Sequence, residues 1–147
     1  MKVRAYVLLV SVGILVMSAS TKKARLSEGN TPGNLAPRIE SLENEREFSF
    51  QNRSGRYTLL NFWAAYDAES RALNIQLWNE VNKLNSSEIE MISISYDKSP
   101  SVFSETVKAD GLNQENQFRD EQGAESELYK KYGLKKGFRN FLIDDKG

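Results

Sequence analysis

The sequence predicts an α/β domain whose sheet has a parallel core and is covered by helices on both faces. Three observations lead to this fold class. Segments with the pattern of strands alternate with segments of helical periodicity, and the connections between them are short. The 147 residues are 39% hydrophobic and 27% charged, which is enough for one domain with a proper core.

Two segments are predicted to be central strands. Thr58–Trp63 is a mostly apolar run, and Ile89–Tyr96 is short and rich in β-branched residues. The apolar run of Thr58–Trp63 is typical of a strand buried on both faces, because neither side faces water, and the β-branched residues of Ile89–Tyr96 indicate another strand.

The strand pattern is weaker towards both ends of the domain. Phe48 and Phe50 alternate with polar residues before a turn-rich "NRSG", which predicts a first strand and a turn. Phe118 marks a short extended piece, and Phe141–Ile143 is a last strand followed by a turn.

A long helix is predicted after Asp67, where the period of the apolar residues changes from 2 to 3.6. It spans Ala68–Leu84, and we expect its apolar residues and the two tryptophans in the core. These residues are Leu73, Leu77, Val81 and Leu84, at spacings of 4, 4 and 3, with Trp63 and Trp78.

Two shorter helices follow. One has Ser99 as its N-cap, Pro100 at its first position and Gly111 beyond its end. The other, "AESELYKKYG", comes after a "DEQG" turn and ends at Gly133.

Residues 1–20 have the pattern of a secretory signal peptide. Lys2 and Arg4 precede an apolar run, Ala5–Met17, and small residues follow it. The run is shorter than the about 20 residues that a membrane span needs, so an uncleaved anchor is the alternative to cleavage. The "VMSAS" segment resembles a lipoprotein cleavage box, but Ser20 replaces the lipidated cysteine. We therefore expect residence in the periplasm or cell envelope, or secretion.

A flexible tether is predicted at residues 21–37, because the composition turns to Lys, Ser, Asn, Gly and Pro with few apolar residues. The folded domain is then expected at residues 38–147.

The composition excludes several kinds of chemistry in this chain. It has no cysteine and no histidine, which rules out thiol chemistry, Cys/His zinc sites, and Ser-His or Cys-His catalysis. The 20 basic and 20 acidic residues balance, so the net charge favours neither nucleic acid nor an acidic membrane as a partner. No phosphate-binding glycine motif is present, and we expect no cofactor.

A candidate site lies where the strand Thr58–Trp63 meets the long helix. In α/β sheets, ligands bind at the carboxyl ends of strands beside helix N-termini. Tyr66 and Asp67 stand at that junction.

The segment "GRYTLLNFWAAYDAESR" resembles the active-site region of exported thioredoxin-like proteins of the TlpA/ResA type, which are redoxins and thiol-disulfide oxidoreductases. The matching stretch of the family carries Phe-Trp-Ala, two variable residues and Cys-x-x-Cys-Arg. "IEMISISYDKSPSVFSETVKADGL" and "YKKYGLKKGFRNFLIDDKG" resemble two further family blocks in order and spacing, so the resemblance covers about residues 36–147.

The resemblance implies a thioredoxin-like fold, with a central mixed sheet flanked by helices. Members of the family usually continue past the Asp-Gly turn with another strand and a helix, whereas this sequence stops at Gly147. We therefore expect a domain without the last strand and helix. Phe141–Ile143 would then be an exposed edge that is open to association with another chain.

The positions that carry the family's chemistry are changed. Asp67 and Ser70 stand at the two cysteines, Tyr66 stands where an aromatic residue often precedes them, and Phe138 replaces the cis-proline. A helix N-terminus lowers the pKa of a thiol, but a carboxylate there can instead accept the free N–H groups as a cap. We expect Asp67 to be such a cap, with ligand contact or acid–base work as the alternative.

Glu69 stands two residues after Asp67, so this pair could hold a cation or act as a general acid/base couple. The simpler interpretation is a solvated first turn rich in acid, and we expect no metal.

Phe138 is expected to follow a trans peptide bond after Gly137, because a cis bond before a non-proline residue costs about 2.5–4 kcal/mol. Its side chain is either an extra core aromatic or an exposed contact residue. The groove is expected to include Tyr66, Asp67, Glu69, Gly137, Phe138 and Arg139.

Basic residues surround this loop: Lys130, Lys131, Lys135, Lys136 and Arg139. They could receive an acidic partner, meet Asp67 and Glu69 across the groove, or simply be solvated.

The sequence therefore predicts a thioredoxin-fold protein that is redox-inactive and binds, if anything, a protein or peptide at the groove. The resemblance implies a thiol-disulfide oxidoreductase or antioxidant redoxin as the alternative, which the cysteine-free chain does not support. A truncated remnant without a selected function is a third possibility.

Overall fold

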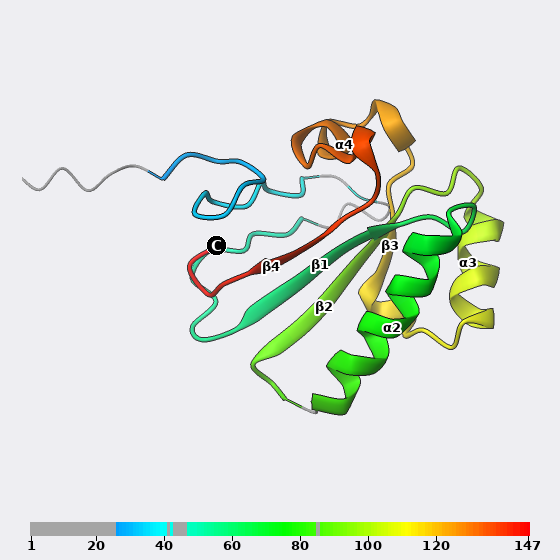
Figure 1. Cartoon of the computed structure of the whole chain (residues 1–147), viewed down its shortest axis with the longest axis horizontal. Coiled ribbons are helices and arrows are strands. Elements are labelled where there is room, and N and C mark those ends of the chain that lie inside the picture. Colours follow the sequence, from blue (N-terminus) through cyan, green and yellow to red (C-terminus); the bar gives the residue numbers. More distant parts are fainter. Residues whose placement is uncertain (1–25, 41, 43–46, 85) are drawn as a thin grey trace, which may run out of the picture.

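The computed structural model describes residues 26–40, 42, 47–84 and 86–147, so the predicted signal peptide lies outside the described residues. Four strands form one sheet in the order β3-β2-β1-β4 (Figure 1). Both β1–β2 and β2–β3 are parallel, whereas β4 runs antiparallel to β1. The predicted mixed sheet is therefore confirmed. The strands are β1 (Tyr57–Trp63), β2 (Ile89–Ser95), β3 (Gln117–Arg119) and β4 (Asn140–Ile143).

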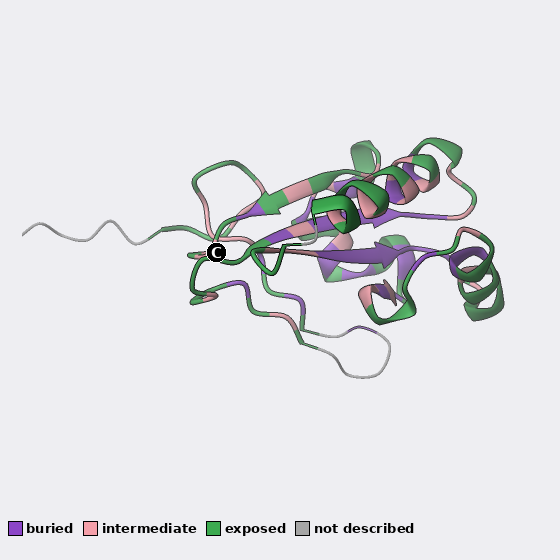
Figure 2. Cartoon of the chain, turned by 90° about the horizontal axis from the view of Figure 1, so that it is seen from below, coloured by how far each residue is buried: buried purple, intermediate pink, exposed green. Residues whose placement is uncertain are grey.

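Helices cover both faces of the sheet, as predicted. On one face α2 (Ala68–Leu84) and α3 (Pro100–Ala109) pack over a core that contains Trp63 and Val107. On the other face α4 (Glu127–Lys131) packs together with the segment before β1. Figure 2 shows the buried residues along the strands between these layers. Single 3-10 turns at Gln114–Asn116, Gly123–Glu125 and Leu134–Lys136 connect the elements.

The side chains of β1 alternate between the two faces of the sheet, so this strand contributes to the core on both sides. Leu60 and Phe62 are 0% and 1% exposed and belong to the core on the α4 side. Asn61 and Trp63 are equally buried but face the α2 side, because successive side chains of a strand point to opposite faces.

The α2 helix has the predicted bounds, but the prediction of its core residues was wrong in part. The α2 residues that are buried are Ser70 and Asn74, whereas Leu84 is 61% exposed. Leu73, Leu77, Trp78 and Val81 are only half-buried. The reason is that α2 lies over β1 and β2, which present Asn61 and Ser93 to it.

A buried hydrogen-bond network joins α2 to the sheet. The Asn74 Oδ1 atom accepts from Asn61 Nδ2 (3.0 Å) and from Ser93 Oγ (2.5 Å), and Asn74 Nδ2 donates to Gln117 Oε1 (3.2 Å). All four residues are at most 5% exposed. Buried polar groups are stable when they are paired in this way, so polar pairing replaces apolar packing beneath the first half of α2.

Two further elements differ from their predictions. The predicted strand at Phe48 and Phe50 is a single bridge between Ile39 and Phe48, although Phe50 is 2% exposed. The third helix begins at Glu127 rather than Ala124, because Ser126 has extended geometry and its side chain caps the Tyr129 N–H at 2.9 Å.

Residues 26–37, which the sequence assigns to a flexible tether, are packed against the domain. The Ala36 N–H donates to the Gly147 carbonyl (2.7 Å), and the Tyr132 hydroxyl donates to the Pro37 carbonyl (2.8 Å). Backbone N–H and C=O groups of this segment form hydrogen bonds with one another in a compact turn, instead of with water. No helix in the described part of the chain is both long and apolar enough to cross a bilayer.

Candidate functional site

The candidate site lies at the carboxyl end of β1, where the chain enters α2. Asp67 Oδ1 accepts the Ser70 N–H at 2.8 Å, which is the geometry of a helix N-cap. The predicted cap is therefore confirmed. The Asp67 carboxylate therefore satisfies one of the N–H groups that a helix leaves free at its start, and its negative charge is favourable there.

Ser70 is bound into the same turn. Its hydroxyl donates to the Asp67 carbonyl at 3.2 Å and accepts the Ala64 N–H at 3.3 Å, and the residue is 7% exposed. Both positions that match the family's cysteines thus hold polar side chains that stabilise the helix start. A buried hydroxyl with no base beside it is a poor nucleophile.

Aromatic side chains form a surface around Phe138, which stands where members of the resembled family have a cis-proline. The Gly137–Phe138 peptide bond is trans, as predicted. Gly137 has φ +118° and ψ 160°, a conformation that is essentially restricted to glycine. The Phe138 ring lies 5.9 Å from the Tyr96 ring at 15° and 6.3 Å from the Tyr66 ring. Tyr66 itself is 74% exposed.

Phe138 combines the two roles that the sequence left open. It is half-buried and packs against the core on the α4 side, while its ring lies beside the exposed Tyr66. The structure therefore brings Tyr66 and Phe138 together from distant parts of the sequence.

Two further residues of the site were not singled out by the sequence. Tyr96 and Asp97 follow β2, the next parallel strand, and are both 2% exposed. The Asp97 carboxylate accepts the Ala65 N–H through both oxygens at 3.0 Å and the Ser95 hydroxyl at 2.7 Å. It thereby fixes the segment that presents Tyr66. Ligands bind at the carboxyl ends of parallel strands, and this rule applies to β2 as well as to β1. It is the sequence signal that could have identified Tyr96 and Asp97.

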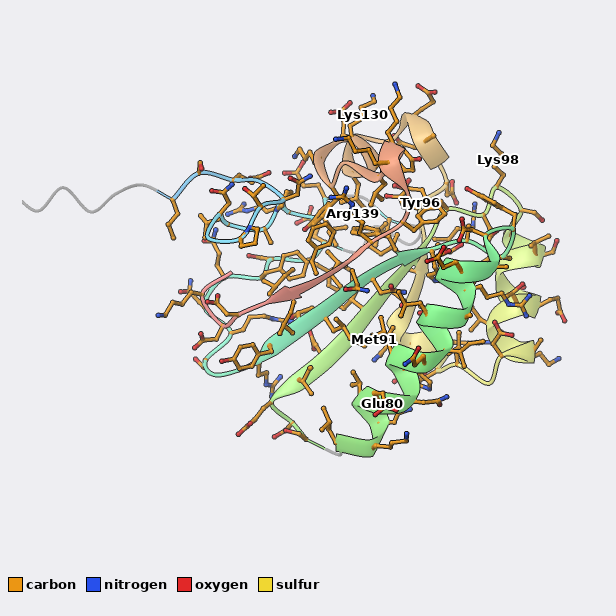
Figure 3. The ribbon with its side chains drawn as sticks, viewed as in Figure 1. Glu80, Met91, Tyr96, Lys98, Lys130 and Arg139 are labelled. Atoms are coloured by element: carbon orange, nitrogen blue, oxygen red, sulfur yellow. The ribbon has the colours of Figure 1, made fainter. Side chains whose placement is uncertain are left out.

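A cavity of about 670 Å³ opens between the start of α2 and the β2–α3 connection. Its size is within the range of small-ligand pockets. Figure 3 shows Tyr96 and Lys98 at this end of the sheet, with Lys98 extending outward. The residues that line the cavity include Tyr66, Arg71, Tyr96, Lys98, Val102 and Thr106.

Arg71 links α2 to α3 beside the cavity. Its Nε atom donates to Asp110 Oδ2 at 2.8 Å and its Nη2 atom to Asp110 Oδ1 at 2.5 Å. This bidentate pair raises the pKa of Arg71 and links the first turn of α2 to the end of α3.

The phenols of the site are held in the neutral form. Burial raises the pKa of Tyr96, and the negative charge of Asp120 raises it further. Tyr66 is largely exposed, yet the pKa of its phenol is raised by its remaining burial, then by Tyr129 and by the carboxylates of Asp97 and Asp67.

The charged residues around the groove do not close it. Glu69 is exposed on the first turn of α2, and within the described residues no ion pair joins it or Asp67 to the basic loop. Lys130 pairs with Glu127 and Lys131 with Glu28. Lys135, Lys136 and Arg139 are exposed. No cluster of three acidic residues suited to a metal occurs in the part that the structure describes.

Comparisons with known proteins identify the class of protein that has this fold. A thioredoxin-like protein from Parabacteroides distasonis is 60% identical, with a TM-score of 0.75, over 84% of this chain and 87% of the other. A thiol-disulfide oxidoreductase from Bacteroides fragilis is 27% identical, with a TM-score of 0.64, over 78% and 85%. The thioredoxin domain of a thiol-disulfide oxidoreductase from Bacteroides vulgatus shares the fold at 20% identity and a TM-score of 0.65, over 78% and 82%.

No model of a protein family matches the sequence, and no curated protein does either. The identity and coverage of the Parabacteroides structure nevertheless show that the chain belongs to the thioredoxin-like proteins. It is a member of this group without a cysteine.

Proposed function

We propose that this chain is a redox-inactive thioredoxin-fold protein of the cell envelope that binds an extended peptide at the groove between Asp67 and Phe138. One observation carries the proposal. The two positions of the family's cysteines are joined in a hydrogen-bonded helix cap, while an aromatic surface persists beside them.

The lack of redox chemistry follows from the replacement of both cysteine positions by Asp67 and Ser70. Thiol-disulfide exchange needs a thiolate that attacks a disulfide sulfur, and neither a carboxylate nor a serine hydroxyl can form the mixed disulfide. Asp67 also occupies the Ser70 N–H, one of the groups that would stabilise a thiolate at this helix start.

Peptide binding is supported by the surface that remains. Exposed aromatic side chains are enriched in binding sites, since a rigid ring buries a large area at a small entropic cost. Tyr66 is exposed, and Tyr96 fixes the Phe138 ring by stacking. The adjoining cavity has room for a side chain of the bound peptide.

Export is part of the proposal and rests on the signal-peptide pattern of residues 1–20. Periplasmic residence is the preferred location, and secretion is the alternative.

An insulin-reduction assay tests the redox part. The wild-type chain is expected to match a blank without protein. The double variant Asp67→Cys/Ser70→Cys serves as the positive control, because residues three apart on a helix lie within the about 4.4–6.8 Å that a disulfide requires between Cα atoms. Reduction by the wild type above the blank would contradict the proposal.

Selection from a phage-displayed library of random peptides tests the binding part. Peptides enriched on the wild type are expected to bind Phe138→Ala at least about tenfold more weakly, because the variant removes the centre of the aromatic surface. Leu84→Ala is the control, as it truncates an exposed apolar residue near the far end of α2. Failure to enrich any peptide, or equal binding to Phe138→Ala, would contradict peptide recognition at this groove.

A further inference from the structure

The cavity between the start of α2 and the β2–α3 connection adjoins the aromatic surface, and Tyr66 belongs to both. The centroid of the Tyr66 ring lies 6.3 Å from that of the Phe138 ring, and Tyr66 also lines the cavity, which has a volume of about 670 Å³. A peptide that lies over the aromatic surface can therefore direct one side chain into this cavity.

Much of the cavity wall is apolar. Val102, on the first turn of α3, is 48% exposed although it is an apolar residue, and Thr106 lies one turn further along the same helix face. Ala65 and Ala124 line the cavity from the segments that follow β1 and β3. Burial of methylene groups against such a wall is favourable, so the wall suits a side chain with an aliphatic stem.

Two cationic side chains line the same cavity. Lys98 is exposed and forms no ion pair within the described residues, and Figure 3 shows it extending outward from the end of β2. Arg71 binds Asp110 through its Nε and Nη2 atoms, so its Nη1 atom makes no hydrogen bond in the part of the chain that the structure describes. Both cations can still donate to a carboxylate, and such charge-assisted hydrogen bonds are stronger than neutral ones.

Asp97 is the acidic residue of the cavity wall, but its carboxylate is already engaged. The residue is 2% exposed, and its oxygens accept the Ala65 N–H and the Ser95 hydroxyl. The exposed charge at the cavity is therefore that of Lys98. A basic side chain that entered the cavity would be repelled by Lys98, whereas an acidic one would be attracted.

Given the peptide binding proposed above, on which this step rests, we infer that the cavity binds an acidic side chain of the peptide, and glutamate in preference to aspartate. The methylene groups of glutamate pack against the apolar wall, and its carboxylate accepts from Lys98 and from Nη1 of Arg71. Aspartate has a shorter stem, and leucine leaves both cations without a partner. The cavity thus adds a sequence preference that the aromatic surface around Phe138 does not supply.

Selection from a phage-displayed library of random peptides tests this preference. Glutamate at one position is expected to be enriched on the wild type at least about threefold over the input library. Lys98→Gln is expected to abolish this enrichment and to bind the peptides selected on the wild type about threefold to fivefold more weakly at low salt. Lys108→Gln is the matched control, because it removes the same charge from an exposed position in the last turn of α3. Both lysines are exposed, so both variants are expected to unfold thermally as the wild type does.

Binding to Phe138→Ala separates a failure of this inference from a failure of peptide binding itself. Selected peptides that lose affinity for Phe138→Ala but show no preference for glutamate would overturn the inference and leave peptide binding at the groove intact. A glutamate preference that persists in Lys98→Gln, or that is lost equally in Lys108→Gln, would also overturn it, since the acidic residue would then respond to charge outside the cavity. Failure to enrich any peptide would overturn both.

Discussion

The buried network around Asn74 gives the sharpest test of the packing between α2 and the sheet. Asn74→Ala removes the acceptor of Ser93 Oγ and the donor to Gln117 Oε1, in a place where Asn74 itself is 0% exposed. Asn61 keeps a partner, because its Nδ2 atom also donates to Ser93 Oγ at 3.3 Å. The substitution therefore leaves the Ser93 O–H without an acceptor and Gln117 Oε1 without a donor, both in a buried place.

The expected loss follows from these two groups. Each unpaired buried group costs about 1–3 kcal/mol, so about 4 kcal/mol is lost in all. Alanine returns about 0.6 kcal/mol through its higher helix propensity. The free energy of unfolding is thus expected to fall by about 3 kcal/mol, which corresponds to a decrease in Tm of about 6–12 °C for a domain of this size.

Urea and thermal unfolding followed by circular dichroism measure this change. Asn79→Ala is the matched control, because Asn79 lies on the exposed face of the same helix. The control is expected to be unchanged or stabilised by up to about 0.6 kcal/mol. A loss below about 1 kcal/mol for Asn74→Ala would refute the reasoning, since it would mean that the network carries no stability.

Three other substitutions test the site and its support. Gly137→Ala places a side chain at φ +118° and is expected to lower the free energy of unfolding by about 1–3 kcal/mol and to alter the near-ultraviolet circular dichroism of the adjacent aromatic rings. Asp67→Ala removes the helix cap and is expected to cost about 1 kcal/mol in urea unfolding, whereas Glu69→Ala, on the same turn, changes little. Tyr132→Phe removes the hydrogen bond to Pro37 and is expected to cost about 1 kcal/mol at neutral pH. Burial, and then the charge of Glu28, raise the folded pKa of Tyr132, so the wild type loses stability as pH rises above the unfolded value of about 10. The difference in free energy of unfolding between the wild type and Tyr132→Phe is therefore expected to shrink above about pH 10. A difference that stays constant with pH would contradict the raised pKa of Tyr132.

Much of the candidate site could be predicted from the sequence because it depends on local signals. The start of α2 at Ala68 and the cap at Asp67 follow from the change of period and from the preference of aspartate for N-caps. Ser99 and Pro100 likewise mark the start of α3, where the Ser99 side chain accepts the Val102 N–H. These features involve residues a few positions apart, so sequence spacing is sufficient to locate them.

The contacts of Phe138 and the burial of Asn74 could not be predicted in the same way. Phe138 meets Tyr66 and Tyr96 only because β4 returns antiparallel beside β1 and brings its preceding loop to the carboxyl ends of the strands. Periodicity identified the apolar face of α2 but not its rotation relative to the sheet. That rotation depends on the polar side chains that β1 and β2 supply.

The sequence by itself determined the order of strands and helices from β1 onward, the absence of thiol chemistry and the cap at the start of α2, because composition and short-range spacing are sufficient for each. Only the tertiary structure decided which polar residues are buried beneath α2 and how the aromatic surface around Phe138 is assembled. These properties depend on the pairing of segments that are distant in the sequence, such as Thr58 with Ile143, and sequence spacing does not record such pairing.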